Sequence, residues 1–201
     1  MKRVVVIDID GVLADFNSAF RRLLISRGAE MKPFECEDPS KWHWFEHYGA
    51  TKTQADAAWG YVEQNPFWWN SLGLHRDVDQ TVDTHLWKVC CKHEVTFITS
   101  RPAGCRDATV HWLKDKFTFE HDPMVIVTPR TKVPALISLA PDVVLEDKGE
   151  TLVEFESLMP VAPKRSILIK RAYNVHWHPA ASVTTVDSTL AGLQMVLNGS
   201  K

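Results

Sequence analysis

Two aspartates near the start of the chain, Asp8 and Asp10, stand one residue apart at the end of a short apolar run. A carboxylate is costly to bury unless it is paired or bound to a cation, so this pair must meet water, a base or a metal. Two further acids, Glu146 and Asp147, follow another apolar run in the same way. Carboxylates gathered at one point repel each other unless a cation is present, and all-oxygen ligands suit Mg²⁺ better than zinc or copper. The four acids therefore predict a Mg²⁺ site.

Hydroxyl and basic residues follow two other apolar runs along the chain. Thr99, Ser100 and Arg101 follow one of them, and Lys132 stands a few residues behind the next. Ligands of an open parallel sheet bind beyond the carboxyl ends of its strands, so we expect these side chains to converge with the acids. Mg²⁺ commonly shares a phosphate with one or two carboxylates, and lysine and hydroxyl donors suit the remaining phosphate oxygens. The set predicts a site for a phosphate ester, in which a carboxylate near the metal can attack phosphorus.

The elements that must position these residues are visible as apolar runs of strand length. They are Val4 to Ile7, Val95 to Ile98, Met124 to Val127, Val143 to Leu145, Ile167 to Ile169 and Val183 to Val186. Most are separated by stretches with apolar residues at helical spacing, as in Phe16 to Leu24 and Val78 to Cys90. This alternation predicts an α/β fold, a Rossmann-like parallel sheet with helices on both faces.

The segment from residue 31 to residue 72 has a different composition. It holds three prolines and five of the eight tryptophans. An aromatic-rich insertion after the first strand and helix predicts a small helical cap rather than another strand and crossover. We expect residues 1–30 and 73–201 to form the core and residues 31–72 to form the cap.

The charge balance narrows the class of partner. The chain has 201 residues and a formal net charge of -2, which gives no electrostatic reason to expect long nucleic acid or an anionic membrane. No apolar segment approaches membrane-spanning length, and the first apolar run carries Asp8 and Asp10, which a signal peptide would not tolerate. We expect a cytoplasmic protein, and an exposed aromatic cap could serve as the surface of a homodimer.

Four sequence motifs carry a family resemblance. "DIDGVLADF", "FITSRP", Lys132 and "VVLEDK" resemble, in order, motifs one to four of the haloacid dehalogenase (HAD) superfamily of phosphohydrolases, and together they span residues 4 to 148. Within that superfamily the chain is most similar to 5'(3')-deoxyribonucleotidases. The features that carry this closer likeness are "DGVLADF", Thr99 to Pro102, "NPFWWNSLGL" and "ILIKRAYN".

The resemblance implies a role for each matching residue. Asp8 would be the nucleophile that forms an aspartyl-phosphate, and Asp10 would act as general acid and base, with its backbone carbonyl on the metal. Thr99 and Lys132 would stabilise the transferring phosphoryl group. Asp147 would bind Mg²⁺ directly.

Other positions are implied with less specific roles. Glu146 stands where the nucleotidases usually have a second aspartate, and it could hold a metal-bound water. Gly11 would let the chain turn tightly beside the phosphate. Phe16, with Trp68 or Trp69, could form a stacking slot for a nucleobase. Ser100 and Arg101 would line the substrate site, with Arg101 contacting sugar or phosphate.

The sequence thus indicates an enzyme, a Mg²⁺-dependent phosphomonoesterase acting on nucleoside monophosphates. One alternative keeps this chemistry and takes a sugar phosphate or another small phosphomonoester as substrate. Another makes the chain a binding or regulatory module on a silent phosphatase core. Asp8 and Asp10 could also form only a structural turn or a cap of the next helix, Lys132 could be merely solvated, and the cap tryptophans could serve only packing.

Overall fold

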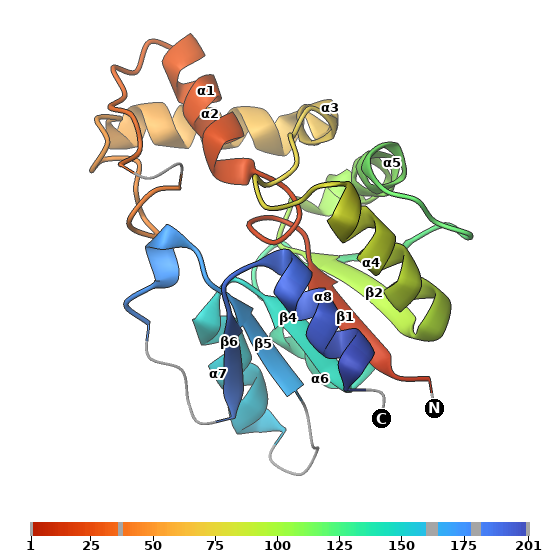
Figure 1. The fold of residues 1–201 in the computed structure, drawn as a ribbon. Helices are drawn as coiled ribbons and strands as arrows, with labels where there is room; N and C mark the ends of the chain where they lie inside the picture. The colour runs from red at the N-terminus through yellow and green to blue at the C-terminus, as the bar shows by residue number, and fades with distance from the viewer. Residues whose placement is uncertain (1, 36–37, 160–164, 178–181, 200–201) are drawn as a thin grey trace.

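The computed structural model describes residues 2–35, 38–159, 165–177 and 182–199 (Figure 1). Its strands are β1 (Val4–Asp8), β2 (Glu94–Thr99), β3 (Met124–Val127), β4 (Val143–Glu146), β5 (Arg165–Ile169) and β6 (Val183–Val186). Its helices are α1 (Phe16–Ser26), α2 (Lys52–Gln64), α3 (Pro66–Asn70), α4 (Gln80–Lys92), α5 (Arg106–Lys116), α6 (Val133–Leu139), α7 (Gly149–Leu158) and α8 (Thr189–Asn198), with short 3-10 turns η1 (Ala103–Cys105) and η2 (Ala172–Asn174). None of these helices is long and apolar enough to cross a bilayer.

The six strands form one parallel sheet in the order β3-β2-β1-β4-β5-β6. Each strand contains one of the apolar runs, so the predicted Rossmann-like architecture is confirmed. In the register of the sheet, Val5 of β1 lies opposite Val95 of β2 on one side and Val143 of β4 on the other. The chain order reverses between β1 and β4, which is where doubly wound sheets bind their ligands.

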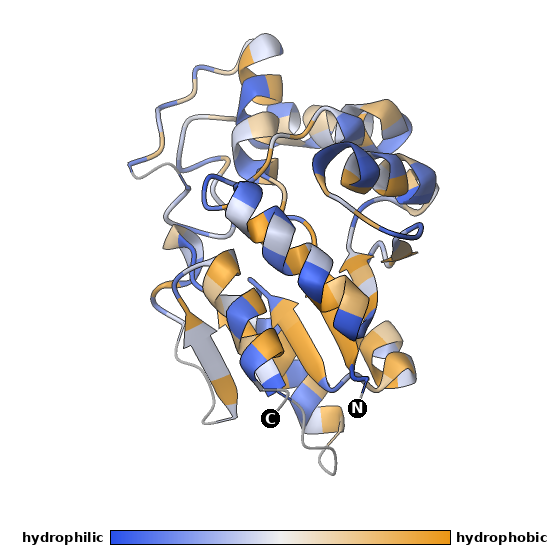
Figure 2. Cartoon of the chain, turned by 45° about the vertical axis from the view of Figure 1, so that its right-hand side comes forward, coloured by the Kyte–Doolittle hydropathy of each residue, from blue (hydrophilic) through white to orange (hydrophobic). Residues whose placement is uncertain are grey.

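Alternate side chains of the strands enter two hydrophobic layers, one on each face of the sheet. Val5 and Ile7 belong to a cluster that also holds the buried faces of α4 and α8, whereas Val6 belongs to a second cluster with α6 and α7. Because both faces are covered, the central strands are hydrophobic along most of their length (Figure 2). This buried sheet fixes the positions of the residues at its strand ends.

Helices α1, α2 and α3 stand together beyond the carboxyl ends of the strands (Figure 1). The ring of Phe20 in α1 lies 4.7 Å from that of Trp59 in α2, and Phe16 lies 5.4 Å from the same tryptophan. Within the aromatic-rich segment, regular helix is confined to α2 and α3. Its described residues before α2 form neither helix nor strand, since prolines and Gly49, at φ +110°, interrupt them.

Candidate active site

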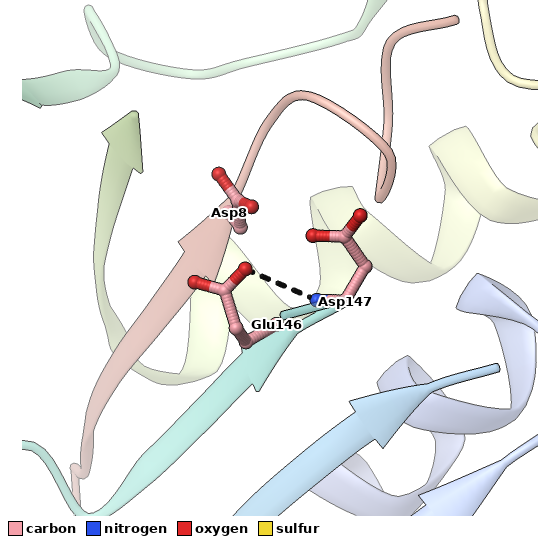
Figure 3. Close-up of side chains that lie close together, drawn as sticks. All are labelled: Asp8, Glu146 and Asp147. Atoms are coloured by element: carbon pink, nitrogen blue, oxygen red, sulfur yellow. Dashed lines mark hydrogen bonds between the residues drawn. The ribbon is translucent and has the colours of Figure 1, made fainter. Parts of the chain in front are cut away.

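Three buried carboxylates meet at the carboxyl edge of the sheet. Asp8 ends β1, Glu146 ends the neighbouring β4, and Asp147 follows it (Figure 3). One oxygen atom from each of the three lies within 4.8 Å of the others. Parallel pairing of β1 and β4 is what brings them to one level, although 138 residues separate Asp8 from Glu146. The predicted convergence of these acids is therefore observed.

Lys132, at the N-terminus of α6, joins this cluster from a third direction. Its Nζ lies 2.6 Å from Asp8 Oδ2 and 2.8 Å from Glu146 Oε2, and its side chain is buried. Burial alone would lower the pKa of Lys132, but Asp8 and Glu146 outweigh it and hold this pKa above its ordinary value. The ammonium group is therefore fixed and charged beside the predicted nucleophile.

Both carboxylate oxygens of Glu146 are already engaged. Oε2 accepts from Lys132, and Oε1 accepts from the backbone N–H groups of Asp147 and Lys148, each at 3.1 Å. Burial would raise the pKa of Glu146, but the charge of Lys132 and side-chain interactions with Asp8, Asp147 and Lys132 outweigh it and lower this pKa to about 2. Glu146 is thus an ionised residue that orients Lys132.

Only one carboxylate oxygen of Asp147 accepts a hydrogen bond from the described residues. The hydroxyl of Tyr173 donates to Oδ2, whereas Oδ1 is buried and has no hydrogen-bond partner among the described residues. Burial and the neighbouring Glu146 raise the pKa of Asp147 to about 7. Burial also raises the pKa of Asp8, and Glu146 adds to that rise. Both shifts express an excess of negative charge in a dry site.

The donor set fits a divalent cation. Three carboxylates stand against one lysine, which leaves two uncompensated negative charges when all are ionised. All candidate ligand atoms are oxygens, and Oδ1 of Asp147 lacks a partner among the described residues. These properties match the hard-ligand preference of Mg²⁺.

Gly11 makes this cluster sterically possible. Its backbone has φ +86°, and a Cβ atom built there would overlap Asp147 Oδ2 and lie 2.6 Å from the hydroxyl oxygen of Tyr173. Glycine is required both for the left-handed backbone and for the close approach of Asp147.

Asp10 points away from the three-carboxylate cluster toward a different partner. Its Oδ2 accepts from the hydroxyl of Thr99 at 2.8 Å, and its carboxylate accepts two further donors from Arg101. Its side chain is partly exposed, and both Asp10 and Ser100 line the cavity described next. Thr99 and Arg101, which the sequence suggested for substrate contact, bind Asp10 in this structure.

A cavity of about 530 Å³ opens above the acids. Asp8, Asp10, Lys132 and Asp147 line it, and its aromatic lining consists of Phe16, Trp42, Trp44, Phe45, Trp59, Trp69 and Tyr173. The rings of Trp59 and Trp69 stack nearly parallel to Phe16, with centroids 5.4 and 5.7 Å away. Of the two adjacent tryptophans considered for a base slot, Trp69 lines the cavity, whereas Trp68 meets Phe16 edge-on.

Sequence reasoning gave no role to the turn after β5. There Arg171 Nε donates to the carbonyl of Gly11 at 2.6 Å, Tyr173 donates to Asp147, and Asn174 Nδ2 donates to the carbonyl of Asp147 at 2.7 Å. The signal was present, because this turn follows a parallel strand just as the four recognised motifs do.

Comparison with known proteins bears on the identity of this site. A family model described as "5' nucleotidase, deoxy (Pyrimidine), cytosolic type C protein" matches residues 2–196. A search of curated proteins finds no match.

Solved structures with a similar fold include hydrolases of the HAD family and a protein in complex with phosphate. A HAD-like hydrolase of Burkholderia xenovorans LB400 has a TM-score of 0.59 at 14% identity, covering 98% of this chain and 97% of that chain. A HAD family hydrolase of Deinococcus radiodurans R1, with bound phosphate and sodium, has a TM-score of 0.51 at 15% identity, with coverages of 98% and 96%. CbbY of Rhodobacter sphaeroides, in complex with phosphate, has a TM-score of 0.50 at 15% identity, with coverages of 96% and 100%. At these identities the likeness establishes only the fold, which is the fold that the resemblance to the HAD superfamily predicted.

Proposed function

Since this chain belongs to the family of cytosolic type C deoxy (pyrimidine) 5' nucleotidases, we propose that it dephosphorylates nucleoside monophosphates, as a Mg²⁺-dependent 5'(3')-nucleotidase with an aspartyl-phosphate intermediate. Family membership makes the chain a phosphoric monoester hydrolase. The observation that carries the finer proposal is the salt bridge of Asp8 to Lys132 in the lining of an aromatic cavity, beside Oδ1 of Asp147, which has no hydrogen-bond partner among the described residues.

Asp8 begins the proposed reaction. One of its carboxylate oxygens bonds to phosphorus while the bond from phosphorus to the ester oxygen breaks. The leaving oxygen takes the electron pair and receives a proton from Asp10. Lys132, held by Asp8 and Glu146, stabilises the charge on the phosphoryl oxygens.

Water completes the cycle. It attacks phosphorus and gives its proton to Asp10, while the bond between phosphorus and Asp8 breaks. Inorganic phosphate leaves, the carboxylate of Asp8 is regenerated, and Asp10 is protonated for the next turnover. One residue thus serves as acid in the first half and as base in the second.

In this proposal the metal ligands are Asp8, Asp147 and the backbone carbonyl of Asp10. Glu146, whose two carboxylate oxygens already accept hydrogen bonds, would contribute by holding Lys132 beside the metal site. When bound there, Mg²⁺ would neutralise the two excess charges and polarise the phosphoryl group. Tyr173 supports this site because burial and Asp147 raise its pKa, so its hydroxyl keeps the proton that it donates to Asp147.

The aromatic lining supports a nucleoside as the leaving group. A nucleobase offers a flat π-face, and Phe16 and Trp69 offer rings at the cavity wall. We propose that residues 31–72 act as a cap that closes over this ligand, above a core of residues 1–30 and 73–201. Helix α1 lies in the core part of this division but packs its aromatic residues against α2.

Two further expectations accompany this proposal. The family description supports a cytosolic location. The expectation of a homodimer through the aromatic cap stays a prediction, which size-exclusion chromatography with light scattering tests.

The test is phosphate release from a panel of nucleoside 5'- and 3'-monophosphates and simple sugar phosphates, with Mg²⁺ or with EDTA. We expect release from the nucleotides that requires Mg²⁺ and is abolished in Asp8→Asn, whose fold is checked by its thermal melt. Activity confined to sugar phosphates would contradict the nucleotide part of the proposal. Silence of the folded wild type on every substrate would contradict the enzyme itself.

A further inference from the structure

Arg101 occupies an unusual position for a charged side chain, since only 1% of its surface is exposed. Its Nη2 donates to Asp10 Oδ1 at 2.8 Å, and its Nε donates to Asp10 Oδ2 at 3.0 Å. Two parallel bonds of this kind fix both the distance and the plane of a carboxylate. The remaining terminal nitrogen, Nη1, donates to the hydroxyl of Thr109 at 3.2 Å.

Two tryptophans hold the guanidinium group itself. Its central carbon lies 5.0 Å from the ring centroid of Trp69 in α3 and 5.5 Å from that of Trp112 in α5. Both indole N–H groups are anchored on backbone carbonyls, of Val62 and Leu72 respectively. Arg101 therefore has little freedom of its own, and the cation–π contacts offset part of the cost of burying its charge.

The two catalytic aspartates thus have different cations. Asp8 is paired with Lys132 at the metal cluster, and Asp10 is paired with Arg101 at the cavity wall. Among the described residues, Arg101 donates hydrogen bonds to Asp10 and Thr109 and none to Asp8. An arginine bound in this way acts on Asp10, the proposed general acid and base, rather than on the phosphoryl group.

We propose that Arg101 is the positioning residue of Asp10, which holds its carboxyl group in the orientation for proton transfer to the leaving oxygen. This inference rests on the proposed function and adds to it a residue that acts through Asp10. Proton donation matters most when the leaving group is a poor one, such as the alkoxide of a nucleoside. It matters least for p-nitrophenyl phosphate, whose phenolate leaves without a proton.

The experiment compares kcat/KM for a nucleoside monophosphate and for p-nitrophenyl phosphate in Arg101→Gln and Arg101→Lys. The value of kcat/KM depends only on the steps up to formation of the phosphoenzyme. Slow hydrolysis of the aspartyl-phosphate therefore does not change it. We expect the value for the nucleotide to fall about tenfold or more and that for p-nitrophenyl phosphate by less than about threefold, since general acid catalysis contributes roughly 10² to 10⁴. Lysine keeps the charge but not the two-pronged geometry, so it should not restore the nucleotide rate.

A matched control and a double variant separate positioning from folding. Arg106→Gln removes an exposed arginine at the start of α5, five residues along the chain, and should change neither rate. In an Asp10→Asn background, Arg101→Gln should lower the nucleotide rate no further, because residues that act through one group are not additive.

Equal losses on both substrates, no loss on either, or full additivity with Asp10→Asn would overturn the proposal. If both Arg101 variants fail to fold, Thr109→Val removes the partner of Nη1, together with the hydrogen bond from Thr109 to the carbonyl of Cys105. It should lower the nucleotide-to-p-nitrophenyl ratio about twofold to threefold, and an unchanged ratio would then overturn the proposal. The wild type is measured first on both substrates. If it hydrolyses neither, the proposed function itself fails, and there is no proton transfer for Arg101 to support.

Discussion

At the scale of single residues, Gly11 combines a backbone requirement with a steric one. Gly11→Ala should lose about 1–2 kcal/mol of stability from its positive φ, and it should also lose activity because a Cβ would displace Asp147. Gly28→Ala is the matched control: it has φ +85°, but no atom of the described residues lies within 4 Å of its added Cβ. Urea unfolding should show a loss in both variants, and the loss should be larger in Gly11→Ala because its Cβ also clashes with Asp147. Phosphate release should fall only in Gly11→Ala. Full activity of a folded Gly11→Ala would contradict this account of the site.

At the scale of elements, the turn η2 links the ends of β4 and β5. Asn174 donates to the carbonyls of Asp147 and Ile169, at 2.7 and 2.9 Å, and accepts from the N–H of Arg171. Asn174→Ala leaves these groups unsatisfied in a buried site and should cost about 2 kcal/mol or more in urea unfolding. Val175→Ala changes an exposed residue of the same turn and should cost less than about 0.5 kcal/mol. Equal losses in the two variants would show that η2 does not tie the strands together.

The strand ends also explain how much the sequence could predict. Asp8, Glu146 and Asp147 follow recognisable apolar runs, and parallel pairing of β1 with β4 brings them together. Lys132 reaches them from the N-terminus of α6, five residues after β3. The partner of Arg101 could not be predicted, because it depends on where two helices place their tryptophans. The helix from residue 189 to residue 198 was not predicted either. In the structure the side chain of Ser188 caps its N-terminus, and the helix packs on α4.

At the scale of the whole molecule, a buried polar chain connects the proposed cap with the core. His75 lies 3.3 Å from Asp38 in the cap segment and 2.6 Å from Asp77, which in turn pairs with Arg171. Burial opposes the charged form of His75, but the hydrogen bonds to the two aspartates outweigh it and raise its pKa. The stability that this charge contributes is therefore fully present below about pH 6.5, the unfolded-state pKa, and is lost as pH rises through the folded-state pKa.

A comparison with His75→Gln tests this linkage. The free energy of unfolding is measured for both proteins from about pH 5.5 to about pH 9, the range in which histidine changes its charge. We expect the advantage of the wild type over the variant to shrink as pH rises. An advantage that grows with pH would contradict the raised pKa, and one that stays constant would remove His75 from the pH dependence of stability.

The central claim of this account is that Asp8 becomes covalently phosphorylated, and trapping that intermediate tests it most directly. Enzyme mixed with a labelled nucleoside monophosphate and Mg²⁺ is quenched in acid within milliseconds, and its peptides are mapped by mass spectrometry. The account predicts a phosphoryl group on the peptide that contains Asp8, absent with EDTA and absent in Asp8→Asn. Phosphate release without any labelled peptide, or a label on another residue, would contradict it.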